Sequence, residues 1–108
     1  MSFEKKKKNI ITLSLQAEYN NACKQFGYKY NSLHEGYAVL LEEVEEVKTE
    51  ITQLLNSFDV FFLFFKRNKQ GHKYLCVEDM YKATENAMAE LAQVGAVLMK
   101  IKNTLEDL

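Results

Sequence analysis

Apolar residues recur along most of this 108-residue chain at the spacing of amphipathic helices. The pattern predicts three helices, at about 3–26, 32–58 and 78–107. The second and third each carry a stripe with alternating steps of four and three residues, which is typical of a helix that packs against another helix. The stripes are Leu40, Val44, Val47, Ile51, Leu54 and Phe58, and then Met80, Thr84, Ala87, Leu91, Val94, Leu98, Ile101 and Leu105.

Residues that begin or interrupt helices agree with this division. The chain has no proline and only four glycines, which is too few turn residues for a strand-rich fold. Ser32 followed by Glu35 forms a capping box, so a helix should begin there. We therefore expect a single all-α domain, an antiparallel helical bundle, over residues 1–108. Gly95 and Ala87 are small enough to let a partner helix approach closely.

The connection at 59–77 is rich in aromatic residues and then in basic ones. The run Val60–Phe65 is apolar on every side, so periodicity does not distinguish helix from strand there. We expect it to continue the second helix or to form a short extra one, buried in the core or at a subunit interface. The basic stretch 66–73 is expected to be an exposed loop.

The overall charge and the cysteines exclude several classes of protein. A net charge of −1 gives no general attraction to nucleic acid or anionic lipid. Cys23 and Cys76 lack the spacing of a zinc site or of a disulfide framework. No secretory signal follows the basic run Lys5–Lys8, and Val60–Phe65 is far shorter than the roughly 20 residues that span a bilayer. We therefore expect a cytoplasmic protein with no membrane or nucleic-acid partner.

Acidic residues flank both apolar stripes in the same way. At about 100° per residue, Glu43 lies some 70° from the centre of the first stripe, and Glu46 lies on the same flank. Glu90 has the same relation to the second stripe, with Gln93 and Lys100 following it. If the two helices pack antiparallel, these carboxylates meet at the edge of the core. Such a group requires a cation, and oxygen ligands favour Mg²⁺ or Mn²⁺. The alternative, an ordinary solvated face, fits the spacing as well.

Two stretches resemble the sequence blocks of the MazG-like nucleotide pyrophosphohydrolases, which are all-α NTP pyrophosphatases. Phe26-Gly27 and the segment from His34 to Glu46 are similar to the first block, with its EExxE pattern at Glu42, Glu43 and Glu46. Ala89–Ala96 is similar to the second block, ExxD in standard enzymes. This chain has Gln93 where those enzymes have Asp, and a neutral amide is a weaker metal ligand than a carboxylate.

The resemblance implies Mg²⁺-dependent cleavage of a nucleoside triphosphate to monophosphate and pyrophosphate. It also implies a homodimer or homotetramer whose four-helix core houses the site. Glu43 and Glu46 would bind the metal from one helix and Glu90 from the other, with Gln93 as a further ligand. Glu42 would either bind metal or position water. Lys100 and His34 are candidate contacts to substrate, although a solvated lysine and a surface histidine remain alternatives.

Three functions are compatible with these patterns. The first is an active Mg²⁺-dependent (d)NTP pyrophosphohydrolase, with Glu42, Glu43, Glu46 and Glu90 as catalytic residues. The second is a nucleotide-binding or regulatory relative that has lost turnover through Gln93. The third is a helical oligomeric interaction module whose acidic residues form only a surface.

Overall fold

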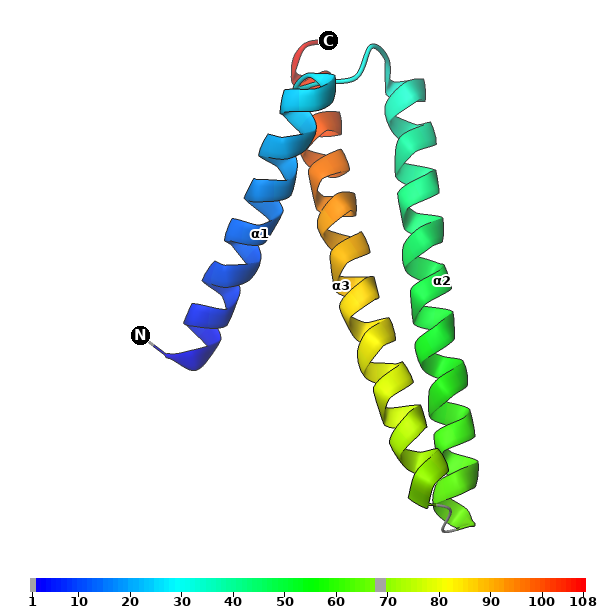
Figure 1. Cartoon of the computed structure of the whole chain (residues 1–108). Helices are drawn as coiled ribbons and strands as arrows, with labels where there is room; N and C mark the ends of the chain where they lie inside the picture. Colours follow the sequence, from blue (N-terminus) through cyan, green and yellow to red (C-terminus); the bar gives the residue numbers. More distant parts are fainter. Residues whose placement is uncertain (1, 68–69) are drawn as a thin grey trace. The chain divides into compact units, whose positions relative to one another are not determined.

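The computed structural model describes residues 2–67 and 70–108, which form three long helices. α1 spans Phe3–Phe26, α2 spans Leu33–Lys66 and α3 spans Gln70–Glu106 (Figure 1). No strand occurs in the described part of the chain. None of the three helices, as far as they are described, combines the length and apolar content needed to cross a membrane. The all-α fold class is thus confirmed, while the pyrophosphatase type and an oligomeric core stay predictions.

The helix ends show which local signals were informative. The Ser2 side chain accepts a hydrogen bond from the Lys5 amide at the start of α1, over a distance of 3.2 Å. Gly27 ends that helix with a φ of 83°, a conformation that glycine adopts without a steric penalty. At the start of α2, the Glu35 amide donates to the Ser32 hydroxyl over 3.1 Å, as expected of a capping box.

Continuation of the second helix through Val60–Phe65, one of the two outcomes expected for this run, is confirmed, because α2 extends past residue 58 to Lys66. Burial of the whole run within the chain is not, since Phe62 and Phe65 are 53% and 62% exposed. The predicted start of the third helix was wrong. α3 begins at Gln70 rather than at residue 78, so Gly71–Lys73 are helical and not part of a loop. No proline interrupts either stretch, and the apolar run has no polar turn residue that would end a helix. Residues 68 and 69 of the expected basic loop lie outside the described residues.

The chain divides into two compact units, and both boundaries fall inside continuous helices. The first unit comprises residues up to Val44 together with Leu91–Leu108, so it contains all of α1. In this unit α1 approaches α3 closely, because a Cβ added at Gly95 would lie 2.6 Å from Leu15 Cδ2. The expectation that Gly95 permits close helix packing is therefore met by a helix of the same chain.

The loop between α1 and α2 is attached to the C-terminal end of α3 within the first unit. The Tyr30 amide donates to the Thr104 hydroxyl over 2.9 Å, and both residues are buried. The Asn103 side-chain amide donates to the Tyr28 carbonyl oxygen over 2.8 Å. Lys29 and Asp107 form an ion pair at 2.9 Å. These contacts hold a loop without regular structure in a defined position beside α3.

The second unit, Glu45–Glu90, is a hairpin of the last part of α2 and the first part of α3. Its buried residues are Val47 on α2 and Cys76, Ala83 and Ala87 on α3. Small side chains on α3 let the two helices lie close together, but they provide little apolar surface to bury.

Each predicted apolar stripe contains both buried and exposed residues. On α2, Val47 and Leu54 are buried or half-buried, whereas Ile51 and Phe58 are 42% and 54% exposed. On α3, Ala87 is buried but Leu91 is 50% exposed. A side chain three or four residues further along a helix points within about 60° of the previous one, so the members of one stripe can point toward two adjacent faces of the helix. Within this chain, a neighbouring helix covers only one of these two faces.

Candidate functional site

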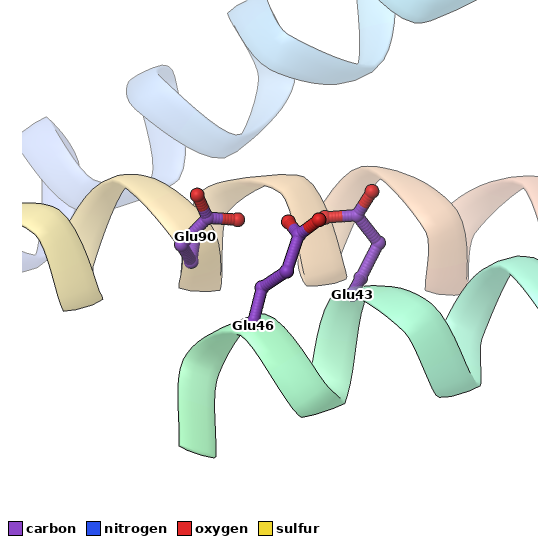
Figure 2. A group of neighbouring side chains, drawn as sticks. All are labelled: Glu43, Glu46 and Glu90. Carbon is purple, nitrogen blue, oxygen red and sulfur yellow. The ribbon is translucent and has the colours of Figure 1, made fainter. Parts of the chain in front are cut away.

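Three of the predicted site residues come together in the structure. One carboxylate oxygen from each of Glu43, Glu46 and Glu90 lies within 4.8 Å of the others. Figure 2 shows Glu43 and Glu46 rising from α2 toward the Glu90 side chain on α3. We refer to these residues as the carboxylate triad. The flanks of the two apolar stripes predicted that these carboxylates would meet if the two helices packed antiparallel, and a role in binding a cation stays a prediction.

The helices place each member of the triad for a simple reason. Glu43 and Glu46 are three residues apart on α2, so they lie on one side of that helix, one turn from each other. Glu46 and Glu90 both belong to the second unit, where the two helices of the hairpin face each other. Glu46 is exposed, whereas Glu43 and Glu90 are half-buried. One oxygen of Glu43 and one of Glu90, Oε2 in each case, is fully shielded from solvent.

The separation of these oxygens suits a divalent cation. Metal–oxygen distances are about 2.1 Å for Mg²⁺ and 2.3–2.6 Å for Ca²⁺, so ligands on opposite sides of one ion are about 4–5 Å apart. A spread of up to 4.8 Å is therefore compatible with a single ion held between the three side chains. An all-oxygen, negatively charged donor set selects a hard cation such as Mg²⁺ or Mn²⁺. Mg²⁺, the smaller ion, requires a modest inward movement of the side chains.

A cavity of about 490 Å³ lies within the first unit. This volume is within the range of about 300–1,000 Å³ that is typical of small-molecule sites. Its lining combines residues from α1, from the α1–α2 loop, from the start of α2 and from the last part of α3. Glu43 lines this cavity, so one residue belongs both to the cavity and to the carboxylate triad. The lining residues are Glu18, Asn21, Ala22, Gln25, Phe26, Tyr30, Glu35, Val39, Glu43, Gln93, Ala96, Val97 and Lys100.

The cavity contains a buried cation beside aromatic rings. Lys100 is only 4% exposed, although lysine is rarely buried unless its charge is compensated. Its Nζ lies 4.3 Å from the centre of the Tyr30 ring and 5.9 Å from that of Phe26. Both rings are close enough for a cation–π attraction. The ammonium group is therefore held at a defined point in a cavity that also contains carboxylates.

Burial and two nearby carboxylates act on the Tyr30 hydroxyl in this cavity. Burial raises the pKa of the Tyr30 hydroxyl, and the carboxylates of Glu35 and Glu43 raise this pKa further. Both effects disfavour a negative charge on the phenol, because low solvent exposure and nearby anions each penalise it.

The other predicted site residues differ in their placement. Gln93 lines the cavity together with Glu43 and Lys100. Glu42 is exposed and is not part of the carboxylate triad. His34 is exposed near the start of α2 and does not line the cavity. Of the residues singled out in the sequence, Gln93 and Lys100 thus line the cavity, whereas Glu42 and His34 lie at the surface.

Sequence reasoning did not identify the part of the cavity that α1 provides. Glu18, Asn21 and Gln25 are spaced by three and four residues, so they form a polar stripe on one side of α1. That spacing is visible in the sequence, but it is also typical of any solvated helix face. Tyr30 and Phe26 were likewise unassigned, because their role depends on contacts with Lys100, some 70 residues away in the chain.

Comparisons with known proteins identify no relative. No protein-family model, no curated protein and no solved structure matches this chain.

Proposed function

We propose that this chain is a Mg²⁺-dependent nucleoside triphosphate pyrophosphohydrolase that releases pyrophosphate and a nucleoside monophosphate. The observation that carries the proposal is that Glu43 belongs both to the carboxylate triad and to a cavity containing Lys100. A metal held by carboxylates and a nearby ammonium group are the two features that binding a triphosphate requires. The two sequence blocks that resemble those of MazG-like proteins support the same activity.

The residues of the chain have separate roles in this proposal. Glu43, Glu46 and Glu90 hold the ion, which would neutralise phosphate charge and lower the pKa of a water molecule bound to it. Lys100 attracts a phosphate oxygen from within the cavity. The ring of Phe26, which is 74% exposed, offers a flat surface on which a base can stack. The Gln93 amide donates or accepts a hydrogen bond at the cavity wall but carries no charge.

Pyrophosphate release from a panel of ribo- and deoxyribonucleoside triphosphates tests the activity directly. We expect release that depends on Mg²⁺ and that falls at least about a hundredfold in Glu90→Gln, since metal sites are highly sensitive to loss of a ligand. Glu85→Gln is the matched control, because Glu85 is also on α3 but is exposed and outside the triad. Absence of pyrophosphate from every triphosphate, or equal rates in both variants, would contradict the proposal.

A second function is nucleotide binding without turnover. Gln93 favours it, because this neutral side chain lines the cavity at the position where the resembling enzymes have a carboxylate. In that case calorimetry should detect Mg²⁺-dependent nucleotide binding while no pyrophosphate forms. Gln93→Asp would then be expected to restore some release, which distinguishes this function from a purely structural role for the acidic residues.

A further inference from the structure

The first turns of α1 are not packed against the described part of the chain. Every residue from Ser2 to Ser14 is exposed, whereas the next residue along the helix, Leu15, lies against Gly95 of α3. Large apolar side chains are among the exposed ones, with Phe3 as the extreme case at 80%. Covering such side chains is favourable, because it removes apolar surface from water. This part of α1 is therefore available to a partner.

Three of the exposed apolar side chains share one side of the helix. At about 100° per residue, Phe3, Ile10 and Leu13 lie within an arc of about 80°. Ile10 and Leu13 are 65% and 69% exposed. Leu15, which approaches α3, points about 160° away from the middle of that arc, so the arc faces away from α3. We call the side of α1 within and next to this arc the outer side of α1.

The outer side of α1 is also positively charged. α1 contains five lysines and two glutamates, although the whole chain has a net charge of −1. Lys6 lies within the arc, and Lys7 lies about 40° from Phe3. Both glutamates, Glu4 and Glu18, point at least about 100° from the middle of the arc. The expectation of no membrane partner was based on the net charge, which does not describe this segment.

We propose that the outer side of α1 binds the surface of a membrane that contains anionic lipids. A helix lying in the plane of such a surface places its apolar side chains at the boundary between headgroups and acyl chains. Lysines at the edge of the apolar side extend their ammonium groups to the lipid phosphates. Each lysine near an anionic surface strengthens binding about fivefold. This inference does not depend on the proposed hydrolase activity.

The apolar side chains favour a lipid surface over other anionic partners. Nucleic-acid phosphates are bound mainly by cationic and polar groups, so Phe3, Ile10 and Leu13 would stay in water on such a partner. A peptide that covers apolar side chains is usually held in a groove, and the cavity of the first unit includes no residue before Glu18. A lipid surface accommodates the lysines and the apolar side chains together. Such a helix lies on a membrane without crossing it.

Co-sedimentation of the intact chain with vesicles tests the charge requirement. We expect binding to phosphatidylcholine vesicles that contain phosphatidylserine, and binding at least about tenfold weaker to phosphatidylcholine alone. The double variant Lys6→Gln with Lys7→Gln should bind the anionic vesicles at least about tenfold more weakly. The matched control is Lys5→Gln with Lys8→Gln, which removes the same charge from the opposite side of α1 and should have a smaller effect.

Circular dichroism verifies that both double variants keep their helices. Absence of binding to the anionic vesicles, equal binding to the neutral ones, or equal losses in the two double variants would overturn the proposal. Duplex DNA added to the intact chain tests the other anionic partner. DNA binding that requires Lys6 and Lys7, without binding to vesicles, would assign the outer side to nucleic acid and would also overturn the proposal.

Tryptophan fluorescence tests which side of α1 meets the lipid. The chain has no tryptophan, so a single introduced one reports on its own surroundings. In Ile10→Trp the emission should move to shorter wavelength on anionic vesicles, because indole rings partition into the membrane interface. In Thr12→Trp, an exposed position on the opposite side of α1, the emission should stay unchanged. A shift in both variants or in neither would overturn the proposed orientation.

Discussion

At the scale of single residues, the space around each helical glycine shows whether a larger side chain could be accommodated there. Gly36 is buried in α2, and a Cβ added there would lie 3.0 Å from Ile101 Cγ1 and 3.1 Å from Tyr30 Cδ2. Gly71, also helical, has no atom within 4 Å of an added Cβ. The two glycines therefore look alike in the sequence but meet different surroundings.

Alanine at these two glycines should have opposite effects on stability. Alanine in a helix is favoured over glycine by up to about 1 kcal/mol. At Gly71 this gain should appear in part, because the position is near the helix start. At Gly36 we expect a net loss of about 1–2 kcal/mol, because the Tyr30 ring and Ile101 have to shift. Urea unfolding of both variants measures the difference, and equal stabilisation of both would contradict the packing around Gly36.

Some contacts of the site residues follow from sequence spacing, whereas others depend on residues far apart in the chain. The spacing of Glu43, Glu46 and Glu90 on two helix flanks predicted their meeting only on the condition that α2 and α3 pack antiparallel, and it fitted a solvated acidic face as well. Lys100 was assigned only by resemblance and flank, yet its burial beside Tyr30 is a tertiary fact. A loop residue has no periodicity, so no pattern in the sequence could place Tyr30 there.

At the scale of elements, the carboxylate triad holds three side chains on α2 and α3 that repel one another when they are ionised. Like charges about 4 Å apart near a surface repel by on the order of 4 kcal/mol before screening. Because Glu46 is exposed, solvent and salt reduce its share to at most about 1 kcal/mol. Helix packing elsewhere has to offset this repulsion when no cation is bound.

Removing one carboxylate charge from the triad should therefore raise the stability of the metal-free chain. It should also reduce the additional stability that the chain gains when a metal ion binds. We expect Glu46→Gln to raise the melting temperature in EDTA by a few degrees, an increase that shrinks at high salt. Mg²⁺ should raise the melting temperature of the unaltered chain, since a ligand that binds only the folded state stabilises it. This Mg²⁺-dependent increase should be largely lost in Glu46→Gln.

Glu85→Gln is the control for that experiment, because it removes a charge from an exposed site outside the triad. It should retain the Mg²⁺-dependent increase in melting temperature. If Mg²⁺ has no effect on the unaltered chain, the triad is a solvated acidic surface and not a cation site.

The length of the helices was the least predictable property of the elements. α2 includes the aromatic run, for which continuation of the helix was one of two expectations, and α3 begins at Gln70, inside the stretch expected to be a basic loop. An apolar run with no turn residue is compatible with helix or strand until packing decides. Here Phe61 and Phe64 are half-buried within the hairpin that α2 and α3 form.

At the scale of the whole molecule, the chain has a small core for its length. Among the described residues, no large side chain is less than 2% exposed. Long-range polar contacts supplement this packing, and the Lys29–Asp107 ion pair, with the Tyr28 hydroxyl 3.3 Å from the same carboxylate oxygen, is one of them. It joins the α1–α2 loop to the C-terminal end of the chain.

The ion pair makes stability depend on pH in a defined direction. A hydrogen bond and the charge of Lys29 lower the pKa of Asp107 below its usual value. A carboxyl group with a lowered pKa stabilises the folded state above its unfolded pKa, near 4. This contribution is lost as the pH falls through the folded pKa. Because both groups are substantially exposed, the contribution is small.

The pKa of Asp107 can be measured directly by NMR titration of its side-chain carbonyl carbon. We expect it to return toward the ordinary aspartate value in Lys29→Gln, where the ion pair is absent. Lys24→Gln, which removes an exposed lysine from the last turn of α1, should leave the titration of Asp107 unchanged. An Asp107 pKa that is the same in all three proteins would contradict the ion pair.

The sequence by itself determined the all-α class, the starts of α1 and α2 and the pair of acidic flanks, because these follow from short-range periodicity and capping. Only the tertiary structure decided which apolar residues face inward. Apolar residues spaced by three and four positions can lie on either of two adjacent faces of a helix, and the neighbouring helix of the chain covers only one of these faces. The same packing placed Lys100 beside Tyr30 and left large apolar side chains of the hairpin exposed, Phe62 and Tyr81 among them. Contacts between residues far apart in the chain leave no periodic signal in its sequence.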